Sequence, residues 1–184
     1  MSTPAAIPAV DRLRYSDTEL PPYSYVPKHA PHPVSDPAGH WFGREEPITP
    51  PLDPQEPYRS KAYLYGIDLF NHGYYWEAHE AWESLWHAAG RTGVTADWLK
   101  ALIKLAAALV KAREGNPRGV ERHARRTLEL LDIVTAQLPG TGGHYCGLSL
   151  ARVEAIARGL VSEAATHYTE ANPTLVLRGW LEIN

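Results

Sequence analysis

The chain has 184 residues, a formal net charge of −3 and a single cysteine, Cys146. This length suits one domain with an extension, and the charge balance offers no electrostatic basis for binding nucleic acid or an anionic membrane surface. One cysteine excludes an intrachain disulfide and a metal site built from several cysteines. The longest apolar run, residues 101–110, is too short to span a bilayer, and the first residues lack the pattern of a secretion signal. We therefore expect a soluble cytoplasmic protein without a nucleic-acid or membrane partner.

The first 57 residues hold 13 of the 16 prolines. Proline lacks the amide donor and fixes its backbone, so neither a helix nor a central strand is expected there. The segment also carries more large apolar side chains than a solvated linker would. These are Tyr15, Tyr23, Tyr25, Val26, Trp41 and Phe42. We predict that residues 1–57 form an extended arm, and that its part from about residue 12 lies across a helical body and buries these rings. The alternative is a disordered tail.

After the arm, proline becomes rare and apolar residues recur at helical spacing. This pattern predicts five helices, at about 58–72, 74–89, 96–114, 117–138 and 150–171. Asn71, His72 and Gly73 form a helix stop. The predicted N-caps of the last three helices are Thr95, Asn116 and Ser149. The third helix is apolar almost all round, which places it at the centre. The outer face of the fourth is basic, and we interpret it as a solvated face.

The predicted fold is therefore all-α, a compact bundle of about five helices in stacked antiparallel pairs. We divide the chain into an arm at 1–57, a helical bundle domain at 58–172 and a C-terminal tail at 173–184. The run from Gly73 to Ala78, Gly-Tyr-Tyr-Trp-Glu-Ala, is also how the second helix of a tetratricopeptide unit often begins. This similarity supports stacked helix pairs, but the pattern is too degenerate to indicate a repeat array.

The stretch 70–87 is the richest in reactive side chains, with three histidines, three tryptophans and several glutamates. On a helix, His79 and Glu83 are four residues apart and Glu80 and Glu83 are three apart, so the three share one face. An imidazole and two carboxylates suit zinc, manganese or iron. One hypothesis is thus a divalent metal site at His79, Glu80 and Glu83, completed by another helix or a second subunit.

Two other interpretations of these residues stay open. Close carboxylates beside a histidine could serve acid–base chemistry, although the sequence offers no convincing nucleophile. Alternatively the cluster is structural, paired with Lys100, Lys104 and tyrosine hydroxyls across the helix pair. In that case the protein could be a tetratricopeptide-like interaction module that binds a protein or peptide. The tryptophans are interpreted as packing rings rather than a ligand-stacking box.

The residues from Phe70 to Trp86 resemble the signature of the family called domain of unknown function 309. The run from Glu77 to Glu83, Glu-Ala-His-Glu-x-x-Glu, carries most of this resemblance, and the segment from Leu99 to Gly119 is also similar. The resemblance implies a compact all-helical fold, often associated as dimers, with no established activity. Where the family usually has glutamines in the third helix, this chain has Lys100 and Lys104. The neutral amides have become ammonium groups, which would repel a cation.

Overall fold

The computed structural model describes residues 4–45, 48–138 and 142–183. Within these residues, five α-helices form the body and two short strands form a hairpin. The helices are α1 (Lys61–Asn71), α2 (Tyr75–Ala88), α3 (Val94–Arg113), α4 (Pro117–Gln137) and α5 (Leu150–His167), and the strands are β1 (His144–Tyr145) and β2 (Leu148–Ser149). The predicted all-α bundle is confirmed. No helix in the described ranges combines the length and apolar character needed to cross a bilayer.

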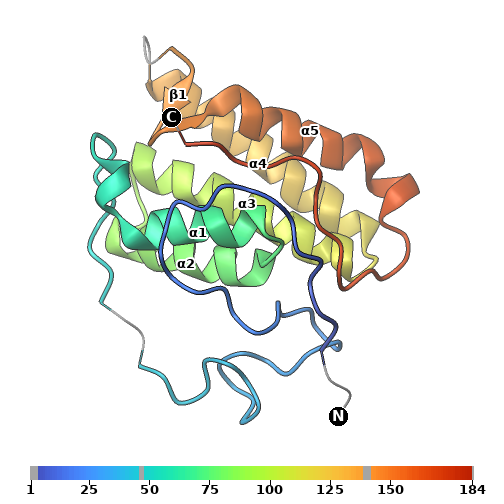
Figure 1. Cartoon of the computed structure of the whole chain (residues 1–184). Coiled ribbons are helices and arrows are strands. Elements are labelled where there is room, and N and C mark those ends of the chain that lie inside the picture. The colour runs from blue at the N-terminus through green and yellow to red at the C-terminus, as the bar shows by residue number, and fades with distance from the viewer. Residues whose placement is uncertain (1–3, 46–47, 139–141, 184) are drawn as a thin grey trace.

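Helix α3 lies at the centre of the bundle, as its apolar sequence predicts. It packs against α2 on one side and α4 on the other, while α1 extends the layer beyond α2 and α5 beyond α4 (Figure 1). Most of its side chains are buried, among them Trp98, Leu102 and Leu109. Helices α1 and α2 approach closely at Gly66. A Cβ added there would lie 2.3 Å from Nε1 of Trp82, so a larger residue would not fit.

Two of the three predicted N-caps are confirmed. The Asn116 side chain accepts a hydrogen bond from the amide of Gly119, and the Ser149 hydroxyl accepts one from the amide of Arg152. The prediction for Thr95 is wrong: α3 begins earlier, after Gly93. The Thr95 hydroxyl instead lies 2.7 Å from the hydroxyl of Tyr145, so the α3 start is tied to the hairpin.

Smaller differences concern the ends of helices and one loop. A short 3-10 helix, η1 (Pro57–Arg59), precedes α1, and Ser60 caps α1 at a later point than predicted. Helix α5 ends at His167 instead of about residue 171. Residues 144–149, between the fourth and fifth predicted helices, form the β1–β2 hairpin, and residues 139–141 lie outside the described ranges.

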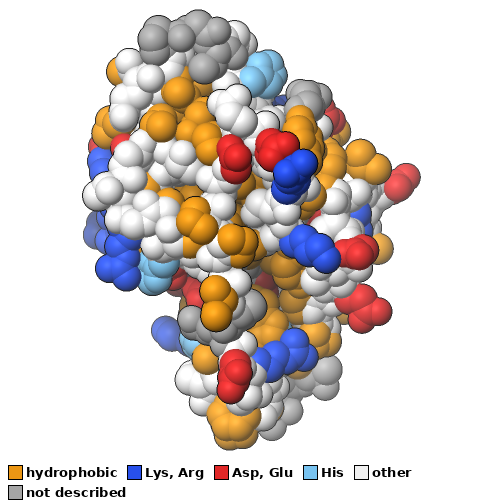
Figure 2. Space-filling view, turned by 90° about the vertical axis from the view of Figure 1, so that its left-hand side faces the viewer, with side chains coloured by type: hydrophobic (Ala, Val, Ile, Leu, Met, Phe, Trp, Pro, Cys, Tyr) orange, Lys and Arg blue, Asp and Glu red, His pale blue; other side chains and the backbone are white. Residues whose placement is uncertain are grey.

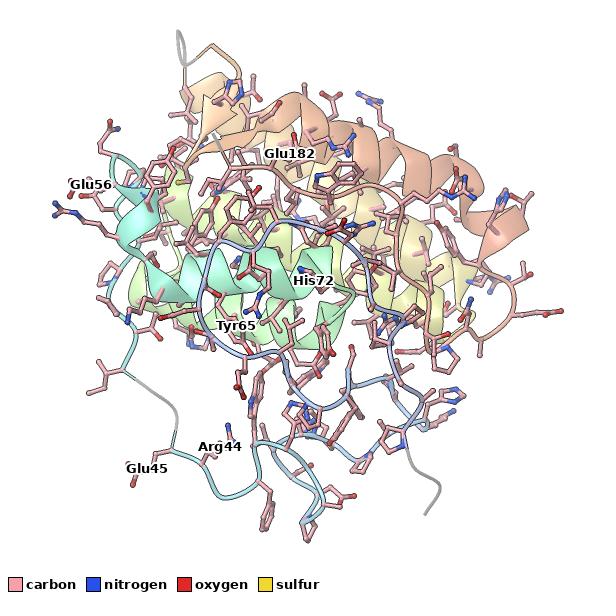
Figure 3. The ribbon with its side chains drawn as sticks, viewed as in Figure 1. Arg44, Glu45, Glu56, Tyr65, His72 and Glu182 are labelled. Carbon is pink, nitrogen blue, oxygen red and sulfur yellow. The ribbon has the colours of Figure 1, made fainter. Side chains whose placement is uncertain are left out.

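The proline-rich residues 4–45 contain no helix or strand and lie against α1 and α2 (Figure 1). Two buried carboxylates, Asp68 of α1 and Glu77 of α2, receive hydrogen bonds from this segment. Of the rings expected to be buried, Tyr23 is buried but Phe42 is 50% exposed. Figure 3 shows Tyr65 on α1 beneath the arm, and its hydroxyl donates a hydrogen bond to the carbonyl of Glu19.

The C-terminal residues return over the bundle and meet the arm (Figure 1). The side chain of Asn71 both donates to the carbonyl and accepts from the amide of Leu181, at 2.8 Å each. Arg113, at the end of α3, donates to the carbonyl of Leu175 and to the hydroxyl of Ser24. One buried guanidinium therefore contacts both ends of the chain.

Candidate functional site

The predicted cluster of His79, Glu80 and Glu83 forms on the surface of α2. One ligand atom from each of the three lies within 4.8 Å of the others. Nδ1 of His79 is 3.2 Å from a carboxylate oxygen of Glu80 and 3.9 Å from one of Glu83. The three side chains are 24%, 34% and 38% exposed, so solvent reaches all of them. We call this group the His/Glu cluster.

The amphipathic pattern of α2 sets this orientation. Its core-facing stripe is Tyr75, Ala78, Trp82 and Leu85, all fully buried and spaced by three and four residues. The His/Glu cluster lies beside this stripe, on the edge of α2 that reaches towards the lysines of α3. Carboxylate and imidazole groups in a half-exposed position can hold an ion or a polar ligand without the full cost of desolvating a charge.

The two lysines of α3 do not form the expected ion pairs with this cluster. In the described part of the chain, neither Lys100 nor Lys104 lies within ion-pairing distance of Glu80 or Glu83. Nζ of Lys100 instead lies 5.2 Å from the centre of the Trp86 ring, a cation–π contact. Lys104 is close enough to Glu83 for that carboxylate to raise its pKa, but burial and the neighbouring cations lower the pKa overall.

A second histidine, His123 of α4, lies near the cluster. Burial, together with the nearby Lys104, Arg122, Lys111 and His79, lowers its pKa to about 4. His123 is therefore a neutral imidazole at physiological pH, able to accept a hydrogen bond or a metal ion. Its proximity to His79 brings α4 to the same region as α2, which the sequence could not show because 44 residues separate the two histidines.

A different acidic residue of α2, Glu77, is fully buried. Its carboxylate accepts hydrogen bonds from the amide of Tyr25 at 2.8 Å and from the hydroxyl of Ser24 at 3.1 Å. Burial raises the pKa of Glu77 to about 7, against the effect of these donors and of Arg113. Glu77 was not among the predicted ligands, and its burial was not expected because it lies off the apolar stripe of α2; Ser24 and Tyr25 of the arm contact it.

His40 of the arm completes this buried group. Its Nε2 is 3.9 Å from the carboxylate of Glu77, its side chain is 5% exposed, and neither ring nitrogen has a hydrogen-bond partner. Burial lowers the pKa of His40 to about 4. Trp41 and Tyr23 pack edge-on against its ring. Glu77 and His40 thus form a buried acid–base pair that joins the arm to α2.

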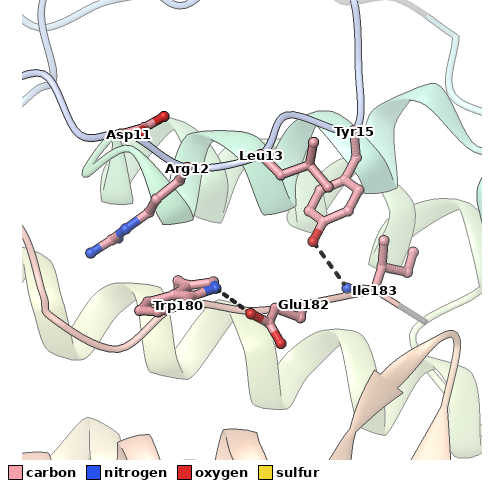
Figure 4. Close-up of a pocket in the computed structure, with 7 residues that line it drawn as sticks. All are labelled: Asp11, Arg12, Leu13, Tyr15, Trp180, Glu182 and Ile183. Atoms are coloured by element: carbon pink, nitrogen blue, oxygen red, sulfur yellow. Dashed lines mark hydrogen bonds between the residues drawn. The ribbon is translucent and has the colours of Figure 1, made fainter.

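The larger of the two best-defined pockets lies away from both groups. It has a volume of about 430 Å³ and opens between residues 11–15 of the arm and 180–183 of the tail (Figure 4). Several polar groups that line it already have partners: Trp180 donates to Glu182, the Tyr15 hydroxyl accepts from the amide of Ile183, and Arg12 donates to the carbonyls of Asn71 and Leu177. We interpret it as a gap where the arm and the C-terminal tail pack against each other, and not as a ligand site.

The described residues offer no activated nucleophile beside the His/Glu cluster. Cys146 is buried in the hairpin, and burial raises the pKa of its thiol to about 12, so the reactive thiolate is absent at neutral pH. The Ser84 hydroxyl donates to the carbonyl of Ala81 within its own helix. The arrangement therefore suits binding better than covalent catalysis.

The comparison with protein families agrees with the resemblance seen in the sequence. The model of the family described as domain of unknown function (DUF309) matches residues 63–123. The match covers most of α1, all of α2 and α3 and the start of α4, and it includes the His/Glu cluster and His123. It leaves out the arm, α5 and the tail. None of the curated proteins compared with this chain gave a match.

Proposed function

We propose that this protein is a metal-binding module in which His79, Glu80 and Glu83 hold a divalent ion. The observation that carries the proposal is the convergence of three ligand atoms within 4.8 Å on a half-exposed helix surface. Three donors at this separation can contact one ion after small rotamer changes, because the side chains are not locked by other partners.

The donor set indicates the kind of ion. One imidazole nitrogen with two carboxylate oxygens suits zinc, manganese or ferrous iron better than calcium or magnesium, which prefer oxygen alone. Three protein ligands leave coordination positions open, as in sites that bind a further ligand. Water, an exogenous ligand or a side chain from a second copy of the chain would fill them, and in the last case the ion would promote a homodimer.

The ammonium group of Lys104 opposes a cation at this place. Coulomb repulsion between the two weakens metal binding without preventing it, since interactions at a partly exposed site are screened. Lys104→Gln, which introduces the amide usual in the resembled family, should therefore tighten metal binding several-fold.

The test uses full-length protein purified without a histidine tag. Titration calorimetry with Mn²⁺ and Zn²⁺ should give one ion per chain for the wild type and for His87→Ala, an exposed histidine on the same helix. Glu83→Gln and His79→Ala should lose at least about tenfold in affinity, because even changes to residues that only orient a metal ligand cost about that much. Light scattering with and without the ion shows whether a second copy completes the site.

Binding to the wild type that is unchanged in both cluster variants would refute the proposal. So would the absence of any binding at millimolar ion. If the ion is absent but a peptide or protein partner binds independently of His79, the tetratricopeptide-like interaction module becomes the better account.

A further inference from the structure

Basic side chains of α3 and α4 gather beside the His/Glu cluster. We define the cationic patch as Lys100 and Lys104 of α3 with Arg122 and Arg126 of α4. Figure 2 shows several Lys and Arg side chains along one edge of the visible face, and the members of the patch are assigned from their contacts. Two of the four are already engaged: Lys100 lies over the Trp86 ring, and Arg126 pairs with Glu129 at 2.7 Å.

Packing of α4 on α3 brings the four together. The hydroxyl of Thr127 donates to the carbonyl of Ala101 at 3.3 Å, and a Cβ added at Gly119 would lie 2.8 Å from Cγ of Lys111. These two contacts fix an antiparallel register of the helices. Arg122 lies between these contacts along α4 and Lys104 lies between them along α3, and Arg122 is close enough to Lys104 to lower its pKa.

Lys104 and Arg122 are the available members of the patch. In the described ranges Lys104 has no ion pair or hydrogen bond, and Arg122 makes only a 3.4 Å contact with the ring of His123. Burial is the largest cause that lowers the pKa of Lys104, and Lys100, Arg126 and Arg122 also lower it, whereas Glu83 raises it. Glu83 offsets only part of the repulsion between these like charges, and an anion bound between Lys104 and Arg122 would relieve more of it.

We propose that Lys104 and Arg122 bind the oxyanion of a small phosphate-bearing ligand next to the His/Glu cluster. The ligand's oxygens would contact these two cations on one side and the metal ion on the other, which also shields the ion from Lys104. Lys100 and Arg126 border this site. This inference rests on the proposed metal site and adds the chemical class of its ligand.

A small phosphate fits the patch better than a nucleic acid does. Guanidinium and ammonium groups on two helices match a compact anion with several acceptor oxygens. A long polyanion needs a continuous basic surface. Here the positive charge is interrupted, because Glu121 pairs with Arg125 and Glu129 pairs with Arg126, and the acidic residues of the His/Glu cluster border the other side.

The experiment measures binding of methyl phosphate to tag-free, full-length protein by titration calorimetry, with and without saturating Mn²⁺. Lys104→Gln and Arg122→Gln should each weaken methyl phosphate binding by about tenfold, as expected for a charge-assisted hydrogen bond. Arg118→Gln is the matched control, an exposed arginine one turn earlier on α4 that should leave it unchanged. Mn²⁺ should strengthen methyl phosphate binding by about tenfold, and His79→Ala should abolish this coupling.

The two proposals fail separately. Methyl phosphate binding that needs Lys104, in a protein that binds no Mn²⁺, would refute the metal site and retain the oxyanion site. Mn²⁺ binding with no methyl phosphate binding, or with binding unchanged in both patch variants, would overturn the oxyanion site and retain the metal site. A short single-stranded oligonucleotide that binds more tightly than methyl phosphate, and depends on Lys104, would overturn the small-ligand assignment.

Discussion

Helix α2 carries glutamates in two contrasting environments within two turns. Glu77 is fully buried under the arm, accepts two hydrogen bonds and has its pKa raised to about 7. Glu80 and Glu83 are about one third exposed, and besides His79 the described residues give neither of them an ion-pair partner. Glu77 thus binds the arm to α2, whereas the carboxylates of Glu80 and Glu83 stay accessible to solvent.

The contrast shows how the environment divides structural from binding roles. A buried carboxylate without donors would cost several kcal/mol, so its partners must come from the protein and its removal must be costly. A half-exposed carboxylate is already hydrated, so its removal costs little stability and its lone pairs remain open to an ion. Substitutions of the buried residues should therefore lower stability and leave metal binding unchanged. Substitutions in the His/Glu cluster should weaken metal binding and leave stability nearly unchanged.

The largest loss of stability is expected for Arg113→Ala. The guanidinium is 1% exposed, contacts the arm at Ser24 and the tail at Leu175, and lies 4.7 Å from the centre of the Tyr75 ring. Its truncation leaves buried acceptors without donors and should lower the free energy of unfolding by about 4 kcal/mol. Urea denaturation measures this, with Arg118→Ala as an exposed control that should change it by less than about 0.5 kcal/mol. A loss as small as that control would mean that the arm and tail are not held by Arg113.

The next effect concerns pH. Glu77 has a folded-state pKa of about 7 against an ordinary 4.5, so its contribution to stability is full below pH 4.5 and is lost as the pH rises through 7. His40 has a folded-state pKa of about 4 against 6.5, so its contribution grows as the pH rises from 4 to 6.5. The two effects have opposite signs, so together they should change the free energy of unfolding little between pH 4.5 and 6.5.

Single substitutions should reveal how each of the two groups changes the free energy of unfolding with pH. Relative to the wild type, Glu77→Gln should gain stability as the pH rises from 4.5 to 7, and His40→Gln should lose it as the pH rises from 4 to 6.5. Each change is worth up to about 3 kcal/mol over its full range. Unfolding measured at several pH values checks both, and parallel pH profiles for wild type and variants would contradict the buried pair.

A smaller effect is expected for Asp68→Asn. The buried carboxylate accepts from the amides of Tyr15 and Ser16 and from the Ser16 hydroxyl. An amide retains one acceptor oxygen and places a donor against these groups, so the variant should lose about 2 kcal/mol. Limited proteolysis should also cleave the arm sooner than in the wild type. Cleavage at an equal rate would show that Asp68 does not hold the arm.

The smallest effect on stability is expected for His79→Ala, at about 0.5 kcal/mol or less, because the side chain is partly exposed and has no partner outside its own helix. His87→Ala is the control for losing a histidine from α2. Thermal unfolding without metal should scarcely separate the two variants, whereas added Mn²⁺ should stabilise only His87→Ala and the wild type. A loss of several kcal/mol in metal-free His79→Ala would instead support a structural cluster.

The helices were predictable from local chemistry. Asn116 before Pro117 and Ser149 before an apolar run specify helix starts in a few residues, and the left-handed Gly73, with φ of 87°, separates α1 from α2. The predicted N-cap at Thr95 was wrong because its hydroxyl contacts Tyr145 of the hairpin, a contact that no local pattern shows. The His/Glu cluster was predictable for the same reason as the helices, since all three residues lie on one helix.

The contacts of the arm were not predictable. Extended, proline-rich chain has no periodicity that indicates which side chain meets which helix, so Glu77 and His40 could not be paired in advance. Glu77 also lies off the apolar stripe of α2, where a carboxylate is ordinarily hydrated. The interpretation of Lys100 and Lys104 as partners of the cluster was wrong because sequence spacing predicts the face of α3 but not where a long flexible side chain ends.

His79 is the proposed nitrogen ligand of the ion in the His/Glu cluster. Pulsed electron paramagnetic resonance of Mn²⁺ bound to tag-free protein tests this directly, because an imidazole nitrogen on the ion gives a distinct nuclear modulation. We expect this modulation in the wild type and in His87→Ala, and its loss in His79→Ala. Bound Mn²⁺ without nitrogen modulation in the wild type, or with the same modulation in His79→Ala, would contradict the account.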